Sequence, residues 1–177
     1  IGVHMVTTQN SLKQNLKLFN LGLPVNTEAQ EGLAILSEYL SGNITLKRLK
    51  KLALRVVAVD MMCNGANFSE SFNFLVGHHY VSVDDAYTIV TRVFRGGGLT
   101  KDYLYLSGFN KILKMWKSDI DLSPFLIGKT SIDFYDTISE MIQRGMISKP
   151  KYITKSILNP IEKKDTSIYE YILSGIN

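Results

Sequence analysis

The chain contains a single cysteine, Cys63, and therefore cannot form an internal disulfide bond. This excludes the disulfide-stabilised secreted scaffolds and indicates a reducing compartment, so we expect a cytoplasmic protein. Long apolar runs are also lacking, since none approaches the roughly 20 residues of a membrane-spanning helix. We expect neither a signal peptide at its start nor a membrane partner. Cys63 ends the apolar run RVVAVDMMC, which predicts a small buried side chain rather than a reactive thiol.

Acidic residues are too few to balance the basic ones. The 20 Lys and Arg residues stand against 16 Asp and Glu residues, which gives a formal net charge of +4. The basic residues are spread along the chain, with the densest cluster in LKRLKKLALR at 46–55. Its leucines recur every three residues, which predicts an amphipathic helix with a solvated basic face. No RNA-binding aromatic motif or Cys/His finger spacing accompanies it, so we expect no nucleic-acid partner.

Helical patterns run through most of the remaining sequence. Apolar spacing and end signals predict helices at about 27–40, 45–63, 82–95, 100–116 and 131–145. Between the second and third of these, NGANFSESFNFLVG at 64–77 predicts a turn and a short helix that ends near Gly77. Thr27, Ser82 and Thr100 are the expected N-caps, and Gly145 is the expected C-cap. The helix at 27–40 carries Leu33, Leu36 and Leu40 along one face, which is its expected core stripe.

Strand patterns of convincing length are absent, although KYITKSI at 151–157 would suit a short strand. The fold class is therefore mainly α, an irregular bundle of about six helices. Residues 1–177 are expected to form one domain, since 177 residues suffice to bury a core without staples. From about residue 148 onward the chain should be looser, because Pro150 and Pro160 interrupt it.

The chain has only three histidines, which limits the possible metal sites. His78 and His79 are adjacent, so their side chains diverge and cannot easily share one metal, and we expect both in a surface loop. His4, beside Met5, is also typical of residues left by an expression vector. Glu31 is expected in the first turn of the helix at 27–40, where an acidic residue is favourable simply because of the helix dipole.

Four segments are more specific than these patterns. They are IGVH at 1–4, LKLFNLGLP at 16–24, QEGLAILSEYL at 30–40 and VFRGGGLTKDYLYLSG at 93–108. Together they resemble the bacterial "flavohemoglobin expression-modulating QEGLA motif" family, which is related to the microtubule-associated tyrosine carboxypeptidases of animals. The resemblance covers about residues 1–155. It implies the C-terminal part of a gluzincin-like zinc metallopeptidase domain, with an H-E-x-x-x-H helix and a downstream glutamate ligand.

The resemblance also assigns individual residues. In that family IGVH completes the H-E-x-x-x-H pattern, so His4 matches the second histidine ligand and Glu31 of QEGLA matches the third ligand. The first histidine and the glutamate base would then immediately precede Ile1, and this chain would be a C-terminal piece. A zinc peptidase needs three protein ligands and an open position for water. The resemblance therefore implies zinc in the intact protein, but neither stoichiometric zinc nor activity in these 177 residues.

The segment VFRGGGLTKDYLYLSG supplies a second set of candidates. A carboxypeptidase must bind a terminal carboxylate, which an arginine binds with two parallel hydrogen bonds, so Arg95 is the first candidate and Lys101 the second. Tyr105 or Tyr103 would donate a hydrogen bond to the developing oxyanion, as a tyrosine does in similar gluzincins. The alternative is that glycines 96–98 make a tight turn between helices and that Arg95 neutralises a helix C-terminus.

Two function classes follow from the sequence. In the first, the intact protein is a zinc-dependent carboxypeptidase that acts on peptide or protein C-termini. In the second, it is a non-catalytic regulatory or interaction module, as the expression-modulating name of the similar family implies. Because fold and family name do not establish a mechanism, the choice depends on the site.

Overall fold

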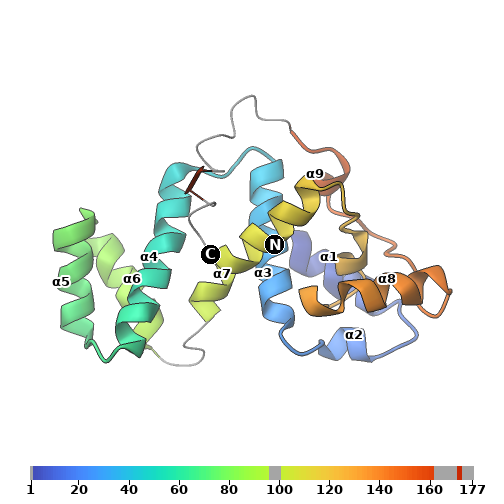
Figure 1. Cartoon of the computed structure of the whole chain (residues 1–177), viewed down its shortest axis with the longest axis horizontal. Coiled ribbons are helices and arrows are strands. Elements are labelled where there is room, and N and C mark those ends of the chain that lie inside the picture. The colour runs from blue at the N-terminus through green and yellow to red at the C-terminus, as the bar shows by residue number, and fades with distance from the viewer. Residues whose placement is uncertain (1, 96–100, 162–170, 173–177) are drawn as a thin grey trace. The chain divides into compact units, whose positions relative to one another are not determined.

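The computed structural model describes residues 2–95, 101–161 and 171–172 of the chain, and most of them are helical (Figure 1). The expected mainly α fold is confirmed: these residues form nine α-helices and two 3-10 helices, and no strand occurs among them. The α-helices are α1 (Gly2–Ser11), α2 (Leu18–Leu21), α3 (Asn26–Leu40), α4 (Leu46–Cys63), α5 (Phe68–His79), α6 (Val83–Phe94), α7 (Lys101–Lys117), α8 (Tyr135–Gln143) and α9 (Lys155–Leu158). The 3-10 helices are η1 (Ser123–Leu126) and η2 (Ile132–Phe134).

The chain, which the sequence assigns to one domain, divides into two compact units. The first unit comprises Ile1–Ile44 and Ser107–Asn177, and the second comprises Thr45–Leu106. Helix α7 therefore begins in the second unit and continues in the first.

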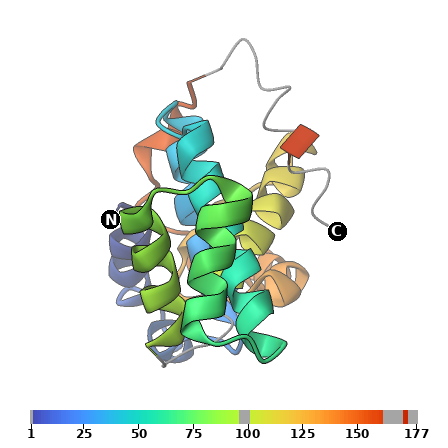
Figure 2. The same cartoon turned by 90° about the vertical axis from the view of Figure 1, so that its left-hand side faces the viewer.

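In the second unit, α4, α5 and α6 pack side by side (Figures 1 and 2). Helix α4 has the expected boundaries, and the Thr45 hydroxyl caps it by accepting the Arg48 N–H at 3.1 Å. Its apolar face joins the other two helices in one buried cluster. The members of this cluster are Leu54, Ala58, Val59, Leu75, Ala86, Ile89, Val90 and Val93. The expected amphipathic helix is thus confirmed, with the lysines on its outer side.

Helix α5 is longer than expected. Asn67 and Glu70 form a capping box at its start, and it continues beyond Gly77 to His79. The predicted surface loop at His78 and His79 is therefore wrong, because both residues form the last turn of α5. Gly77 does not end the helix, since only the later Tyr80 adopts a left-handed conformation, with φ 50°.

In the first unit, α3 carries the core stripe that its leucines predict. Leu33, Leu36 and Leu40 are all at most 1 % exposed. The expected N-cap Thr27 is wrong: α3 begins one residue earlier, at Asn26, and its N-cap is Val25. Val25 has a left-handed φ of 58° and offers no capping side chain, so the backbone turn before α3, rather than a capping hydroxyl, sets where this helix begins.

The segment 148–161 packs against α1 and α3 of the first unit. The fully buried Asn10 amide donates to Leu126 O at 2.8 Å and to Tyr152 O at 2.7 Å, and its oxygen accepts the Tyr152 N–H at 2.9 Å. Further along, Ile161 N donates to Leu40 O at 2.7 Å. The short strand suggested for 151–157 does not form, because the backbone turns into α9 at Lys155.

Three other expectations concern single positions. Cys63 is exposed rather than buried, because the last turn of α4 directs it away from the cluster that its apolar neighbours join. Ser82 caps α6 as expected, since its hydroxyl accepts the Asp85 N–H at 3.3 Å. Glycines 96–98 and Thr100 lie outside the described residues.

Candidate functional site

The structure brings together the two side chains assigned as zinc ligands. His4 lies on α1 and Glu31 on α3, and these two helices contact each other in the first unit. His4 Nε2 is 3.5 Å from Glu31 Oε2. The His4 side chain is 45 % exposed, whereas the Glu31 side chain is only 13 % exposed. A largely buried carboxylate therefore faces a histidine that solvent can still reach.

Electrostatics couple this pair. The hydrogen bond to Glu31 raises the pKa of His4 above its ordinary value of 6.5, although burial acts in the opposite direction. The helix-dipole explanation for Glu31 fails, because α3 begins at Asn26 and its first-turn acid is Glu28. Glu31 lies in the second turn, where the dipole effect has fallen off. Its position facing His4 therefore needs another explanation.

The residue before Glu31 ties three segments of the first unit together. The Gln30 side-chain oxygen accepts the Thr7 hydroxyl at 2.9 Å, and its nitrogen donates to Gly128 O at 3.3 Å. Thr7 also donates to His4 O at 3.1 Å, one turn back along α1. Gln30 and Thr7 are 6 % and 1 % exposed. These bonds fix α1 against α3 where His4 and Glu31 meet.

The residue after Glu31 allows another helix to approach closely. A Cβ at Gly32 would lie 2.5 Å from Gly108 O and 2.9 Å from Gly108 Cα, which are closer than real contacts. Only glycine therefore fits at this crossing of α3 and α7. Sequence analysis assigned a role to Glu31 alone, whereas in the structure Gln30 and Gly32 hold the elements around it.

Glu28 has a structural role that its position in the sequence does not reveal. It is 7 % exposed, its Oε1 accepts the Ser107 hydroxyl at 2.5 Å, and its Oε2 lies 2.9 Å from Lys111 Nζ. Glu28 thus links α3 to α7 beside the glycine crossing. Glu28 and Glu31 of α3 thus have different surroundings: Glu28 is paired with a lysine, and Glu31 faces a histidine.

The described part of the chain brings only two candidate metal ligands together, His4 and Glu31. No group of three His, Cys, Asp or Glu side chains suited to a metal ion occurs within residues 2–95, 101–161 and 171–172. His78 and His79 belong to the other unit, on α5, and Phe74 stacks against the ring of His78. The described histidines and acids therefore provide the His4–Glu31 pair and no further ligand beside it.

The four candidates for substrate binding all lie in the second unit. Arg95 is the exposed C-cap residue of α6, while Lys101 and Tyr103 are exposed on the first turn of α7. Tyr105 is half-buried, and its hydroxyl accepts a hydrogen bond from Arg92 Nη2 at 3.3 Å. The side chain that contacts the Tyr105 hydroxyl is thus Arg92, which the sequence does not single out.

Arg92 belongs to a cluster that sequence analysis missed. Its Nε donates to Asp102 Oδ1 at 2.7 Å, and Arg55 Nη1 lies 3.7 Å from the same oxygen. The Tyr105 ring lies near both guanidinium groups, at 5.9 Å from Arg55 Cζ and 5.8 Å from Arg92 Cζ. The only sequence signal was the spacing of Arg92, which falls on the same face of α6 as the buried Ile89 and Val93.

A comparison with family models gives a match over residues 1–174, to the model described as microtubule-associated tyrosine carboxypeptidase. The chain belongs to this family. No curated protein and no solved structure matches it. The resemblance seen in the sequence is thus confirmed for the tyrosine carboxypeptidase family, while membership of the narrower bacterial QEGLA group stays a prediction.

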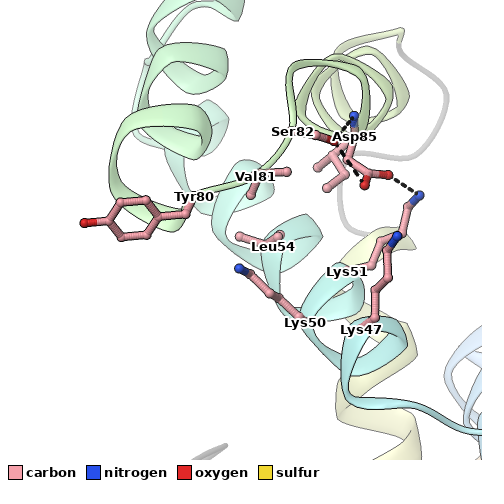
Figure 3. A pocket seen from close by; sticks show the side chains of 9 residues that line it. Lys47, Lys50, Lys51, Leu54, Tyr80, Val81, Ser82 and Asp85 are labelled. Carbon is pink, nitrogen blue, oxygen red and sulfur yellow. Dashed lines mark hydrogen bonds and ion pairs between the residues drawn. The ribbon is translucent and has the colours of Figure 1, made fainter.

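This family member also has a basic pocket in its second unit, with a volume of about 260 Å³. Lys47, Lys50 and Lys51 of α4 line one side of the pocket, and the 80–82 segment and α6 line the other (Figure 3). Lys50 Nζ donates to His79 O at 2.8 Å, and Lys51 Nζ lies 3.0 Å from Asp85 Oδ1. Two lysines of the basic face therefore bind neighbouring elements and are not simply solvated.

The helices of the described part give no sign of a membrane span. None of them is long and apolar enough to cross a bilayer.

Proposed function

We propose that this chain supplies two ligands, His4 and Glu31, to the zinc site of a metallocarboxypeptidase that acts on peptide or protein C-termini. The observation that carries the proposal is the 3.5 Å separation of His4 Nε2 and Glu31 Oε2. It involves the two residues that the family pattern assigns as ligands, in a chain that matches the family over residues 1–174. The description of the family as a tyrosine carboxypeptidase supports the substrate class.

The geometry of the pair suits zinc. Two ligands bonded to one zinc ion at about 2.0–2.2 Å in a tetrahedral arrangement lie about 3.4 Å apart. The observed separation of 3.5 Å leaves room for one ion between the two side chains. Gln30 and Thr7 support this arrangement, because their hydrogen bonds hold the ligand-bearing turns of α1 and α3 together. Such supporting contacts around the ligands are typical of metal sites.

The pair is insufficient for catalysis. A catalytic zinc site has three protein ligands, and the described residues contain no third one beside the pair. We therefore propose that the 177 residues alone bind zinc weakly and have no peptidase activity. In the intact protein, zinc would supply the activation of a water molecule, whose pKa it lowers to about 7.

Substrate recognition is proposed for the second unit. Arg95 and Lys101 are the candidates that the sequence gives for binding the terminal carboxylate, and their exposure is compatible with this role. Tyr105 or Tyr103 would donate a hydrogen bond to the oxyanion that develops in the reaction. For Tyr105, the hydrogen bond from Arg92 supports this role, because it leaves the phenolic proton free for another acceptor.

The test is a zinc-binding measurement on the chain extended by His-Glu before Ile1. We expect one tightly bound zinc ion per extended chain, and its loss in His4→Ala and in Glu31→Gln. His78→Ala and Glu38→Gln serve as controls, because His78 is an exposed histidine of α5 and Glu38 lies elsewhere on α3. The extended chain should also release tyrosine from a peptide acid and leave the corresponding amide intact.

Two results would contradict the proposal. Zinc that stays bound in both ligand variants would show that His4 and Glu31 form only an ion pair. Tightly bound zinc together with activity in the 177-residue chain would show that no further ligand is needed. A chain that binds zinc through the pair but cleaves no peptide would favour the regulatory module over the peptidase.

A further inference from the structure

The arginine cluster of the second unit contains more positive than negative charge. One carboxylate oxygen, Oδ1 of Asp102 on α7, is approached by two arginines, Arg55 of α4 and Arg92 of α6. Asp102 is 8 % exposed in its side chain, and Arg55 is 12 % exposed. Two guanidinium groups thus share one largely buried carboxylate, which leaves one positive charge without a counter-charge among the described residues.

Arg55 is the member of the cluster whose buried Nε has no hydrogen-bond acceptor among the described residues. Its Nη1 is 3.7 Å from Asp102 Oδ1, which is too long for a hydrogen bond. Buried arginines are normally paired and hydrogen-bonded, because an unpaired buried charge loses its hydration without compensation. Arg55 therefore offers N–H donors in a site from which water is largely excluded.

Asp102 cannot neutralise both arginines. Its Oδ1 accepts the Arg92 Nε–H at 2.7 Å, and this hydrogen bond raises the pKa of Arg92. The pKa of Arg55 is instead lowered, first by burial and then by the charge of Arg92. The carboxylate is thus committed to Arg92, and Arg55 experiences the repulsion of that neighbour.

Tyr105 stabilises the charge of the cluster without accepting hydrogen bonds from Arg55. Its ring centre lies 5.9 Å from Arg55 Cζ and 5.8 Å from Arg92 Cζ, within cation–π range. A ring face attracts a cation but has no lone pair in the plane of the guanidinium N–H groups. The free donors of Arg55 therefore still need an oxygen acceptor from a ligand.

We infer that Arg55, together with Arg92, forms a binding site for the carboxylate group of a ligand. A carboxylate carries the single negative charge that the cluster lacks, whereas a phosphate dianion would exceed it. Its planar pair of oxygens also matches the N–H fork of a guanidinium. The inference deepens the proposed function. It rests on that function in one respect only, namely that the carboxylate belongs to a peptide C-terminus. The inferred arginines for binding this carboxylate are Arg55 and Arg92, in place of Arg95.

The test uses nuclear magnetic resonance of the ¹⁵N-labelled 177-residue chain, which has five arginines and therefore five Nε–H signals. The probes are an acetylated dipeptide ending in tyrosine and the same dipeptide with a C-terminal amide. We expect the acid to shift the Arg55 and Arg92 signals and the amide to leave them in place. Arg144, an exposed arginine paired with Glu140 in the first unit, is the internal control.

A conservative variant tests the donor geometry. Arg55→Lys keeps the positive charge but loses the fork, so binding of the acid should weaken about tenfold or more, as for loss of a hydrogen bond to a charged group. Arg144→Lys, the matched control, should bind the acid like the unmodified chain. Arg95→Lys compares the inferred site with the arginine that sequence analysis favoured, and we expect it to retain binding.

Several outcomes would overturn the inference. One is that the Arg55 signal stays in place at acid concentrations that shift signals elsewhere; another is that acid and amide shift it equally. A third is that inorganic phosphate shifts it at lower concentration than the acid, which would assign a different anion. A larger loss of binding in Arg95→Lys than in Arg55→Lys would also overturn it. Zinc is absent from these titrations, so a failed zinc test would leave a positive result standing.

Discussion

Gly32 and Gly108 lie backbone to backbone where α3 crosses α7. A side-chain carbon at Gly32 would stand 2.9 Å from Gly108 Cα, and one at Gly108 would lie 3.1 Å from the Glu28 carbonyl carbon. The contact atoms belong to backbone, which cannot move aside as a flexible side chain would. The glycine of QEGLA therefore sets the distance between the two helices in the first unit.

Replacing Gly32 by alanine should destabilise the chain by about 1–3 kcal/mol, the usual cost of forcing an extra carbon into a packed interior. Urea unfolding followed by circular dichroism measures this change. Gly77→Ala is the matched control, because Gly77 is also helical but has no atom within 4 Å of an added Cβ. That control should stabilise the chain by about 0.5–1 kcal/mol. Equal effects of the two substitutions would refute the close crossing.

Asn10 gives a second test of the first unit. Its side chain is fully buried and makes three hydrogen bonds to the backbone of Leu126 and Tyr152. Asn10→Ala should cost about 2–4 kcal/mol, because it leaves several backbone groups without partners. Asn15→Ala, an exposed control, should change the free energy of unfolding by less than about 0.5 kcal/mol. A loss of unfolding free energy as small as that of the control would mean that Asn10 does not stabilise the packing of residues 148–161.

Helices with strong apolar periodicity could be predicted from the sequence, because that signal is local. The stripe of Leu33, Leu36 and Leu40 and the amphipathic character of α4 are both present in the structure. Helix ends were less predictable. Thr27 is a good capping residue, yet α3 starts earlier, after a left-handed Val25. Gly77 is a common helix-ending residue, yet α5 continues past it to a left-handed Tyr80. These boundaries depend on backbone conformation that residue preferences do not specify.

The candidate site, too, could be predicted from the sequence only in part. His4 and Glu31 could be named from the family pattern, and the structure brings them to 3.5 Å. The roles of Gln30 and Glu28 could not, because their partners lie far along the chain, 98 positions away for Gly128 and 83 for Lys111. In a single sequence, nothing relates such distant positions. The same holds for Arg55, whose charge looked like one more residue of a basic helix.

The pH dependence of stability should reveal the ion pair between Lys51 and Asp85 in the basic pocket (Figure 3). The hydrogen bond from Lys51, and then its charge, lower the pKa of Asp85 below its ordinary value of 3.8. A lowered folded-state pKa stabilises the protein above the unfolded value, and this contribution disappears as pH falls through the folded value. As the pH falls, Asp85 is protonated at a higher pH in the unfolded chain than in the folded chain, so acid favours unfolding.

We therefore expect Asp85→Asn to lower the thermal unfolding midpoint at neutral pH. The difference from the unmodified chain should shrink as the pH falls below 3.8. Melting curves recorded by circular dichroism over this range measure it. Asp84→Asn removes a neighbouring charge from the same first turn of α6 and serves as the control. A difference that stays constant with pH would exclude the ionised Asp85 as its source.

Substitutions of Glu28 and Glu31 on α3 should separate stability from metal binding. Glu28→Gln places a neutral amide between Ser107 and Lys111 where the protein has a charged acceptor. The residue at this position is only 7 % exposed. It should cost about 1–3 kcal/mol of unfolding free energy, as expected for hydrogen bonds to a charged group. Zinc binding by the chain extended with His-Glu should change little, because Glu28 does not face His4.

Glu31→Gln should have the opposite effects. Its carboxylate is 3.5 Å from a histidine whose side chain is 45 % exposed, so water screens this ion pair from the histidine side. Measured in the presence of a chelator, its unfolding free energy should therefore fall by less than that of Glu28→Gln. Its zinc content should be lost, since a neutral amide is a poor ligand in place of a carboxylate. If instead Glu31→Gln proves the more destabilising variant and keeps its zinc, Glu31 is a structural residue like Glu28.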